Sequence, residues 1–230
     1  MRGLRVVVLT VILSSVLYSP VLADICSLSF CQCEDSDVSC HGEDKEDLKL
    51  SPSSLPSSIS SLTLSNLASL TIMTNTFSDQ EDLKELHLSN IGNVVLEKFC
   101  YSSSELSGHI THLNLVNINM MDLQSANTFD NFPQISHVVI KKVGMKIVPT
   151  GGLKLYSDTM LIEECNIGEL HRESIYSDSQ TFVFINNKVK IIKTQAISCS
   201  NNNFNFSGND ISKIESNAIS VAFLSGDLSR

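Results

Sequence analysis

Apolar and polar positions recur along this chain with a period of about 22 residues. The stretch FVFINNKVKIIKTQAI at 182–197 is followed by FNFSGNDISKIESNAI at 204–219, with Phe, Phe, Asn, Ile, Ala and Ile matched at a spacing of 22. The second Phe of each stretch belongs to a series that runs back through the chain at steps of 22, 22, 22, 25, 27 and 24. We call its seven members the mark residues: Phe206, Phe184, Ile162, Ile140, Leu115, Leu88 and Leu64. Self-similarity at such a period predicts a stack of repeated coils.

Each unit has further fixed positions around its mark residue. Another apolar residue stands two positions earlier, and this alternation predicts a strand with both apolar side chains facing the core. Eight positions after the mark comes an apolar residue that predicts a return onto the core: Ile214, Ile192, Leu170, Val148, Leu123 and Leu96. Three positions after the mark stand Asn209, Asn187 and Cys165, where an Asn side chain can bond backbone groups at the turn out of the strand.

This template resembles the leucine-rich repeat, whose unit contains L-x-L-x-x-N/C-x-L. The resemblance covers residues 26 to about 225. Units one to four depart from it, because the Asn position holds Leu67, Ile91, Ile118 and Val143. It implies an α/β-type solenoid dominated by a parallel β-sheet, a horseshoe or arc of about seven coils with little regular helix. The loose agreement of the units with the repeat pattern is similar to that of secreted arthropod repeat proteins.

Four cysteines lie close together in CSLSFCQCEDSDVSC: Cys26, Cys31, Cys33 and Cys40. Close-set thiols pair in an oxidising compartment, and the C-x2-C pairs typical of a zinc site are missing, so two disulfides are expected. The spacing leaves the connectivity open. It also looks like the N-terminal cap of extracellular leucine-rich repeat proteins, which implies Cys26 with Cys33 and Cys31 with Cys40.

The N-terminal residues predict a secreted protein. Arg2 and Arg5 precede an apolar run at 6–17 that is too short to span a bilayer, and Ala23 ends a cleavage signal, so 1–23 is expected to be a signal peptide. We expect a cysteine-rich cap at 24–54, the repeat solenoid at 55–225 and a tail at 226–230. Removing the two arginines lowers the formal charge of −9 by two, which argues against nucleic acid or anionic lipid as a partner.

A right-handed parallel β-helix is the rival architecture, since its coils have a similar length. Polysaccharide lyases and hydrolases of that kind need clustered Asp, Arg or Lys on one strand face. The predicted outward strand residues form no such constellation: Thr63, His87, Asn114, Val139, Leu161, Val183 and Asn205. We therefore expect no enzyme, no cofactor and no metal. A β-helix enzyme and a structural matrix component stay open as alternatives.

The concave sheet face is the expected binding face of such a solenoid. His112 and His137 occupy the same position in successive units, so they are predicted to be neighbours near His87, and Glu85 stands just ahead of its strand. Neutral imidazoles so placed can share a metal or respond to pH, although a merely solvated face is the simpler interpretation. Further along, this face becomes apolar at four outward positions, which is typical of a protein interface: Val139, Leu161, Val183 and Ile185.

Three other features bear on partners. Asn205 begins the chain's single glycosylation sequon and, if it faces outward, a glycan would restrict partners at that end. Cys165 and Cys100 fall at positions expected to be buried, whereas Cys199 lies near the outer turn and is the candidate for an exposed thiol. A homodimer through the C-terminal edge or Cys199 is therefore an expectation. The leading functional hypothesis is a secreted, non-enzymatic module that binds an extracellular protein or a surface glycan.

Overall fold

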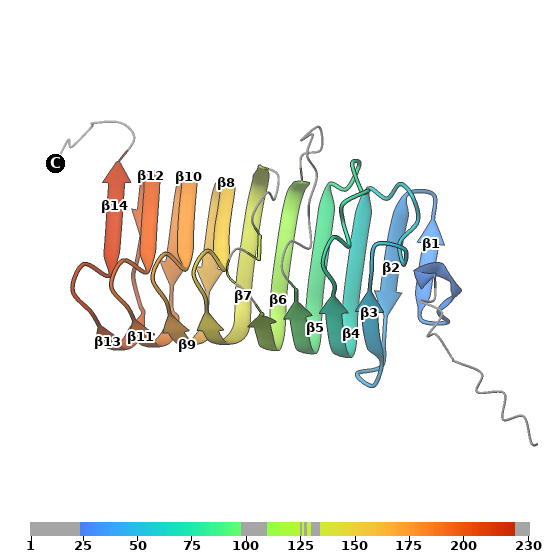
Figure 1. Cartoon of the computed structure of the whole chain (residues 1–230), viewed down its shortest axis with the longest axis horizontal. Helices are drawn as coiled ribbons and strands as arrows, with labels where there is room; N and C mark the ends of the chain where they lie inside the picture. Colours follow the sequence, from blue (N-terminus) through green and yellow to red (C-terminus); the bar gives the residue numbers. More distant parts are fainter. Residues whose placement is uncertain (1–23, 98–109, 125, 127, 130–133, 224–230) are drawn as a thin grey trace, which may run out of the picture.

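The computed structural model describes residues 24–97, 110–124, 126, 128–129 and 134–223 (Figure 1). In this part of the chain only one short 3-10 helix, η1 (Ile25–Ser27), accompanies the strands. The strands are β1 (Cys31–Glu34), β2 (Asp37–His41), β3 (Asp47–Leu50), β4 (Ser61–Ile72), β5 (Glu85–Leu96), β6 (Ile110–Leu123), β7 (Ile135–Val148), β8 (Leu153–Glu163), β9 (Asn166–Leu170), β10 (Ile175–Ile185), β11 (Lys188–Ile192), β12 (Ile197–Asn205), β13 (Asp210–Ile214) and β14 (Ile219–Phe223). All pairings except β1 with β2 are parallel.

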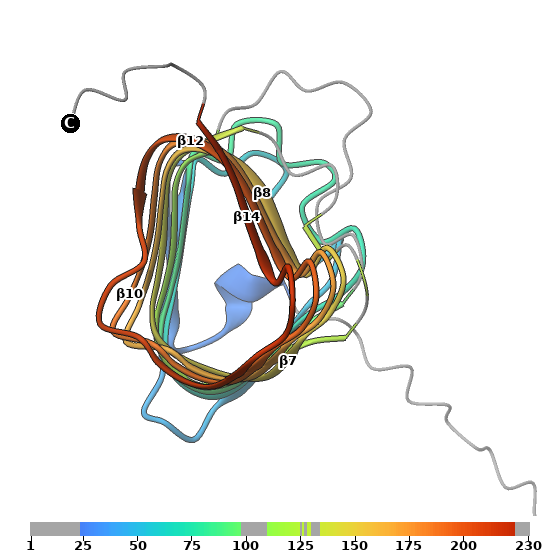
Figure 2. The same ribbon diagram turned by 90° about the vertical axis from the view of Figure 1, so that its left-hand side faces the viewer.

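The chain is a parallel-sheet solenoid whose coils have up to three sides, so the view along the stack is triangular (Figure 2). We call the side that carries the mark residues the first side, with rungs at 37–41, 61–65, 85–89, 112–116, 137–141, 159–163, 181–185 and 203–205. The second side comprises β3, β9, β11, β13 and the C-terminal halves of β4 to β7. The third side has rungs at 153–157, 175–179, 197–201 and 219–223.

The turn from the first to the second side has one backbone conformation in every unit. The residue two positions after the mark has a positive φ of 54–70° throughout: Asn66, Asn90, Asn117, Lys142, Glu164, Asn186 and Gly208. Left-handed backbone is unfavourable for most L-residues and is tolerated best by Gly and Asn, which explains why Asn stands at four of these seven positions and Gly at one. A second left-handed corner follows eleven positions after the mark, at Asn75, Gly151, Glu173, Gln195 and Asn217.

The mark residues whose coils are flanked on both sides are fully buried, and they stack along the solenoid. Towards the C-terminal end the stack becomes aromatic, with Phe184 and Phe206 at a ring-centroid distance of 5.0 Å and Phe182 and Phe204 at 5.9 Å. Burial of aliphatic and aromatic side chains between coils is the main stabilising contribution, because each coil has no core of its own.

The predicted Asn ladder is present in the last two units, at Asn187 and Asn209. The Asn187 side chain accepts a hydrogen bond from the Cys165 amide at 2.9 Å and donates one to the Ile162 carbonyl at 3.0 Å. Asn209 repeats the arrangement one coil later, accepting from the Asn187 amide and donating to the Phe184 carbonyl. The side chains therefore satisfy backbone groups that the turn would leave unpaired.

Two disulfides close the N-terminal end, and they join Cys26 to Cys33 and Cys31 to Cys40, the pairs that the resemblance implied. The cap also contributes to the ladder, because Val38 and Cys40 are buried in register with Leu62 and Leu64. The solenoid thus has about eight turns rather than seven, and its first coil begins inside the segment assigned to the cap.

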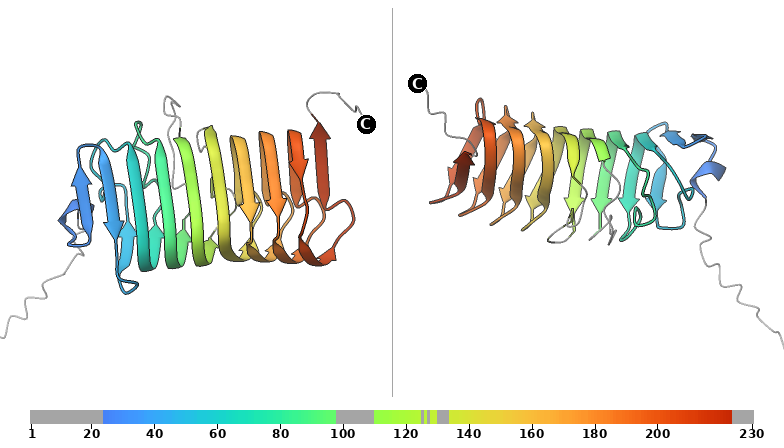
Figure 3. Two further views of the ribbon diagram at one scale, coloured as in Figure 1. Left: turned by 180° about the vertical axis from the view of Figure 1, so that it is seen from behind. Right: turned by 90° about the horizontal axis from the view of Figure 1, so that it is seen from above.

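The structure differs from a horseshoe. The coils stack along a nearly straight line in Figures 1 and 3, so the first side is an even surface rather than a concave one. The units of 22 residues carry second-side and third-side strands in addition to the first-side strand. In the unit of Leu64, residues 73–84 form turns in place of a third-side strand. Within the described ranges, no helix is long and apolar enough to cross a membrane.

Candidate functional site

The outward residues of the first side form straight rows across the strands. Glu85, His112 and His137 are register partners in β5, β6 and β7, so they lie within the strands rather than ahead of them. The next row contains all seven of the predicted outward residues: Thr63, His87, Asn114, Val139, Leu161, Val183 and Asn205. Residues from different units are therefore held about 4.8 Å apart by the ladder.

A polar cluster occupies the N-terminal half of these rows. The ring centroids of His112 and His137 are 5.1 Å apart, which confirms that they are neighbours. Glu85 Oε2 lies 3.3 Å from His87 Nε2, and Glu85 Oε1 lies 3.9 Å from His112 Nδ1. The Asn114 amide is 2.7 Å from His87 Nδ1 and orients that ring from its other side.

The cluster has the geometry of a hydrogen-bonded surface. Its carboxylate is 46% exposed, and His137 bonds outward to Thr159 Oγ1 at 2.8 Å. Across the described part of the chain, no group of three His, Cys, Asp or Glu side chains is placed to hold a metal ion. These groups can donate and accept hydrogen bonds across an interface.

An apolar strip adjoins the cluster. Val139, Leu161 and Val183 are direct register partners in β7, β8 and β10, and all three side chains are half-buried on the outward face. Ile185 lies in the neighbouring row, opposite Glu163. We call Val139, Leu161, Val183 and Ile185 the apolar strip.

Charged residues border the apolar strip on the same face. Lys141 Nζ lies 2.7 Å from Glu163 and 3.3 Å from Glu164, and these hydrogen bonds raise the pKa of the Lys141 ammonium. At the other end, the Asn205 side chain is exposed beside Val183, so the sequon does face outward. The strip is thus an aliphatic centre within a polar rim, the arrangement found in protein interfaces.

The two described free cysteines are both buried. Cys165 was expected to be buried, and its burial raises the thiol pKa to about 11. The expectation of an exposed Cys199 is wrong. Its side chain points inward from the third side, 2% exposed, and burial raises its pKa to about 12. Cys199 therefore gives no support to a disulfide-linked dimer, and Cys100 lies outside the described residues.

A second polar cluster, which the sequence reasoning missed, lies on the second side. Glu169 Oε2 is 2.8 Å from Lys193 Nζ and 3.2 Å from His171 Nε2. Hydrogen bonds from Lys193 and then His171 lower the pKa of Glu169. The sequence carried a signal for this cluster. Glu169 stands seven positions after its mark residue, and His171 and Lys193 both stand nine positions after theirs. The last two therefore occupy the same position in adjacent coils.

Comparison of the chain with known protein families, with curated proteins and with solved structures gives no significant match.

Proposed function

We propose that this protein is a secreted, non-enzymatic binding module that recognises an extracellular protein through the first side of its solenoid. The observation that carries the proposal is the apolar strip, in which Val139, Leu161 and Val183 occupy one outward row on three adjacent strands. The leader-like N-terminus and the two disulfides support an extracellular setting.

The surface favours a protein partner on physical grounds. Half-buried aliphatic side chains contribute binding free energy when they leave water, at roughly 25 cal/mol per Å² of apolar area. The strand ladder fixes the strip's backbone, so little conformational entropy is lost on association. The adjoining His and Glu side chains supply directional hydrogen bonds, which favour one partner over others.

The test is a crosslinking pull-down from extracellular fluid with the secreted protein, comparing wild type with Val139→Asp/Leu161→Asp/Val183→Asp. The matched control is Ile147→Asp, which adds a carboxylate at an exposed apolar residue (39% exposed) of the second side. We expect wild type and the control to capture the same protein and the triple variant, folded by circular dichroism, to lose it. Capture of the same partner by all three would refute the assignment to the first side.

A further inference from the structure

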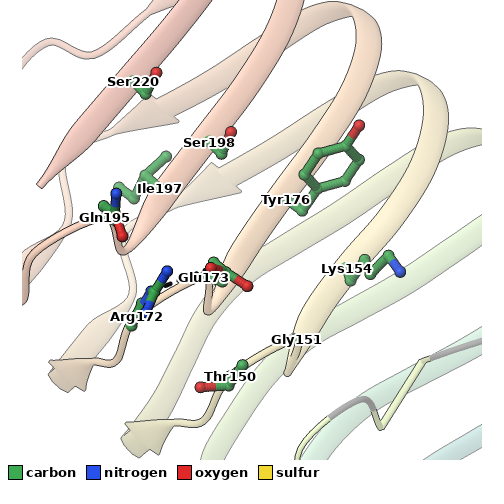
Figure 4. A pocket seen from close by; sticks show the side chains of 10 residues that line it. All are labelled: Thr150, Gly151, Lys154, Arg172, Glu173, Tyr176, Gln195, Ile197, Ser198 and Ser220. Carbon is green, nitrogen blue, oxygen red and sulfur yellow. Dashed lines mark ion pairs between the residues drawn. The ribbon is translucent and has the colours of Figure 1, made fainter.

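The third side carries a groove that the proposed function does not use (Figure 4). It has a volume of about 450 Å³, within the range typical of ligand sites. One wall is a row of register partners on four adjacent strands, Lys154, Tyr176, Ser198 and Ser220. The opposite wall is the second left-handed corner, where Arg172 and Glu173 lie.

One aromatic side chain, Tyr176, lines this groove, and a second, Tyr156, packs against it. Tyr156 and Tyr176 are the two tyrosines that the structure describes, and their rings meet edge to face at a centroid distance of 5.8 Å. Tyr156 is 43% exposed and Tyr176 is half-buried. The phenylalanines whose side chains are described instead pack in the core or against it, and the chain contains no Trp. An exposed aromatic pair therefore distinguishes this side from the rest of the described surface.

Hydrogen-bonding groups of both kinds surround the rings. Ser198 and Ser220 offer hydroxyls that donate and accept, Gln195 offers an amide, and Glu173 offers a carboxylate. Arg172 Nε lies 3.1 Å from Glu173 Oε1, so this pair is oriented at the rim of the groove. Asp178, the register partner of Tyr156, adds a second carboxylate close by. The two carboxylates thus balance the positive charges of the lysine and the arginine at the groove. The site favours a ligand rich in hydroxyls over a polyanion.

The shape of the groove favours a linear ligand. The row from Lys154 to Ser220 crosses three strand spacings of about 4.8 Å, a span of about 14 Å along the solenoid axis. The two middle strands of this wall, β10 and β12, are paired on both sides along the row, so an extended peptide finds no open strand edge between them. A chain of pyranose rings needs no such edge, because it offers an apolar C–H face to an aromatic ring and hydroxyls to its flanks.

We propose that this groove binds a linear oligosaccharide of neutral hexopyranose units, with one sugar ring packed on Tyr176 and neighbouring hydroxyls bonded to Ser198, Gln195 and Glu173. The site is separate from the apolar strip, so either can be correct without the other.

The experiment is isothermal titration calorimetry of the full chain with neutral hexasaccharides of β-1,4-linked glucose, β-1,3-linked glucose and β-1,4-linked N-acetylglucosamine. An α-1,4-linked galacturonate hexamer serves as the anionic comparison. We expect at least one neutral probe to bind. Tyr176→Ala should weaken that binding at least about tenfold, as loss of an aromatic anchor does, whereas Tyr176→Phe should keep most of it. Ile147→Asp on the second side is the matched control and should bind the probe as wild type does.

Three outcomes overturn the proposal. The first is that no neutral probe binds, and the second is that only the galacturonate binds. The third is that a neutral probe binds wild type and Tyr176→Ala equally. Circular dichroism and thermal unfolding of each variant separate loss of the site from loss of the fold, since Tyr176 faces outward from the sheet.

Discussion

Asn187 offers a direct test of how the coils are joined. Its side chain is fully buried, and the Asn187→Ala variant leaves the Cys165 amide and the Ile162 carbonyl without their partners. A buried backbone group that loses its hydrogen bond costs about 1–3 kcal/mol, so the two together predict a loss of about 2–6 kcal/mol. With a urea m-value of about 2–3 kcal/mol/M for a chain of this size, the unfolding midpoint should fall by roughly 1–3 M.

Two further variants make this test specific. Asn203→Ala removes an exposed Asn one coil away and should change the free energy of unfolding by less than about 0.5 kcal/mol. The free energy of unfolding of Asn187→Cys should lie between those of wild type and Asn187→Ala. Cys165 holds the same position one unit earlier, where its thiol lies 3.5 Å from the Ile140 carbonyl. A Cys at this position therefore provides a donor but only a weak acceptor. Equal urea midpoints for Asn187→Ala and Asn203→Ala would refute the ladder as a stabilising element.

Three other predictions follow from the same geometry. Cys165 and Cys199 should resist iodoacetamide at pH 8 in the folded protein and react fully in urea, because burial raises their thiol pKa values to about 11 and about 12. Rapid labelling of the folded chain, detected by mass spectrometry, would contradict their burial. Gly144→Ala should destabilise by about 1–3 kcal/mol in urea unfolding, since a Cβ there meets the carbonyl oxygen of the preceding coil, and an unchanged midpoint would argue against that close contact. The pKa of Glu169 is lowered in the fold, so its stabilising contribution is present above the unfolded pKa and is lost as pH falls through the folded value. Glu169→Gln and Lys193→Met should therefore both flatten the decline in thermal stability below about pH 5. A decline in either variant that equals the wild type's would contradict the pairing.

Much of the first side could be predicted from the sequence because its inward residues are large and apolar. Alternation at the mark residue and two positions before it repeats in every unit, so the strand, its register and its outward row follow together. The pairing of His112 with His137 and the position of the apolar strip are consequences of that single register. The Asn ladder was predictable for a similar reason, since the turn needs a side chain that bonds the backbone.

The first coil was missed because its inward residues do not look like the others. Val38 and Cys40 take the places of Leu62 and Leu64, but Cys40 is also a disulfide partner, and its spacing to other cysteines was the stronger signal. The covalent bond and the ladder position coexist, so the cap both covers the edge and extends the sheet. A cysteine pattern alone could not show this.

The third side was missed for a different reason, because its inner wall mixes apolar residues such as Leu153 and Ile175 with small polar ones. Ser177, Ser179 and Asn201 are all buried there, with Ser177 Oγ 2.8 Å from Ser179 Oγ and Asn201 Nδ2 2.8 Å from the same hydroxyl. These polar inward positions interrupt the hydrophobic periodicity from which a strand is predicted. Cys199 alternates with these residues and so faces the same interior, against the expectation from its distance to the mark.

The backbone ladder of the third side accounts for the constant coil length. Adjacent coils that pair strand to strand on all three sides must keep one register, and a coil with two or three extra residues would break it. The spacing is 22 from Ile140 onward, where third-side strands are present, and 24–27 before it. The same constraint aligns Lys154, Tyr176, Ser198 and Ser220 into the outer row that lines the groove. Among the described residues, the groove therefore lies on the regular C-terminal coils, where the third-side strands pair with one another.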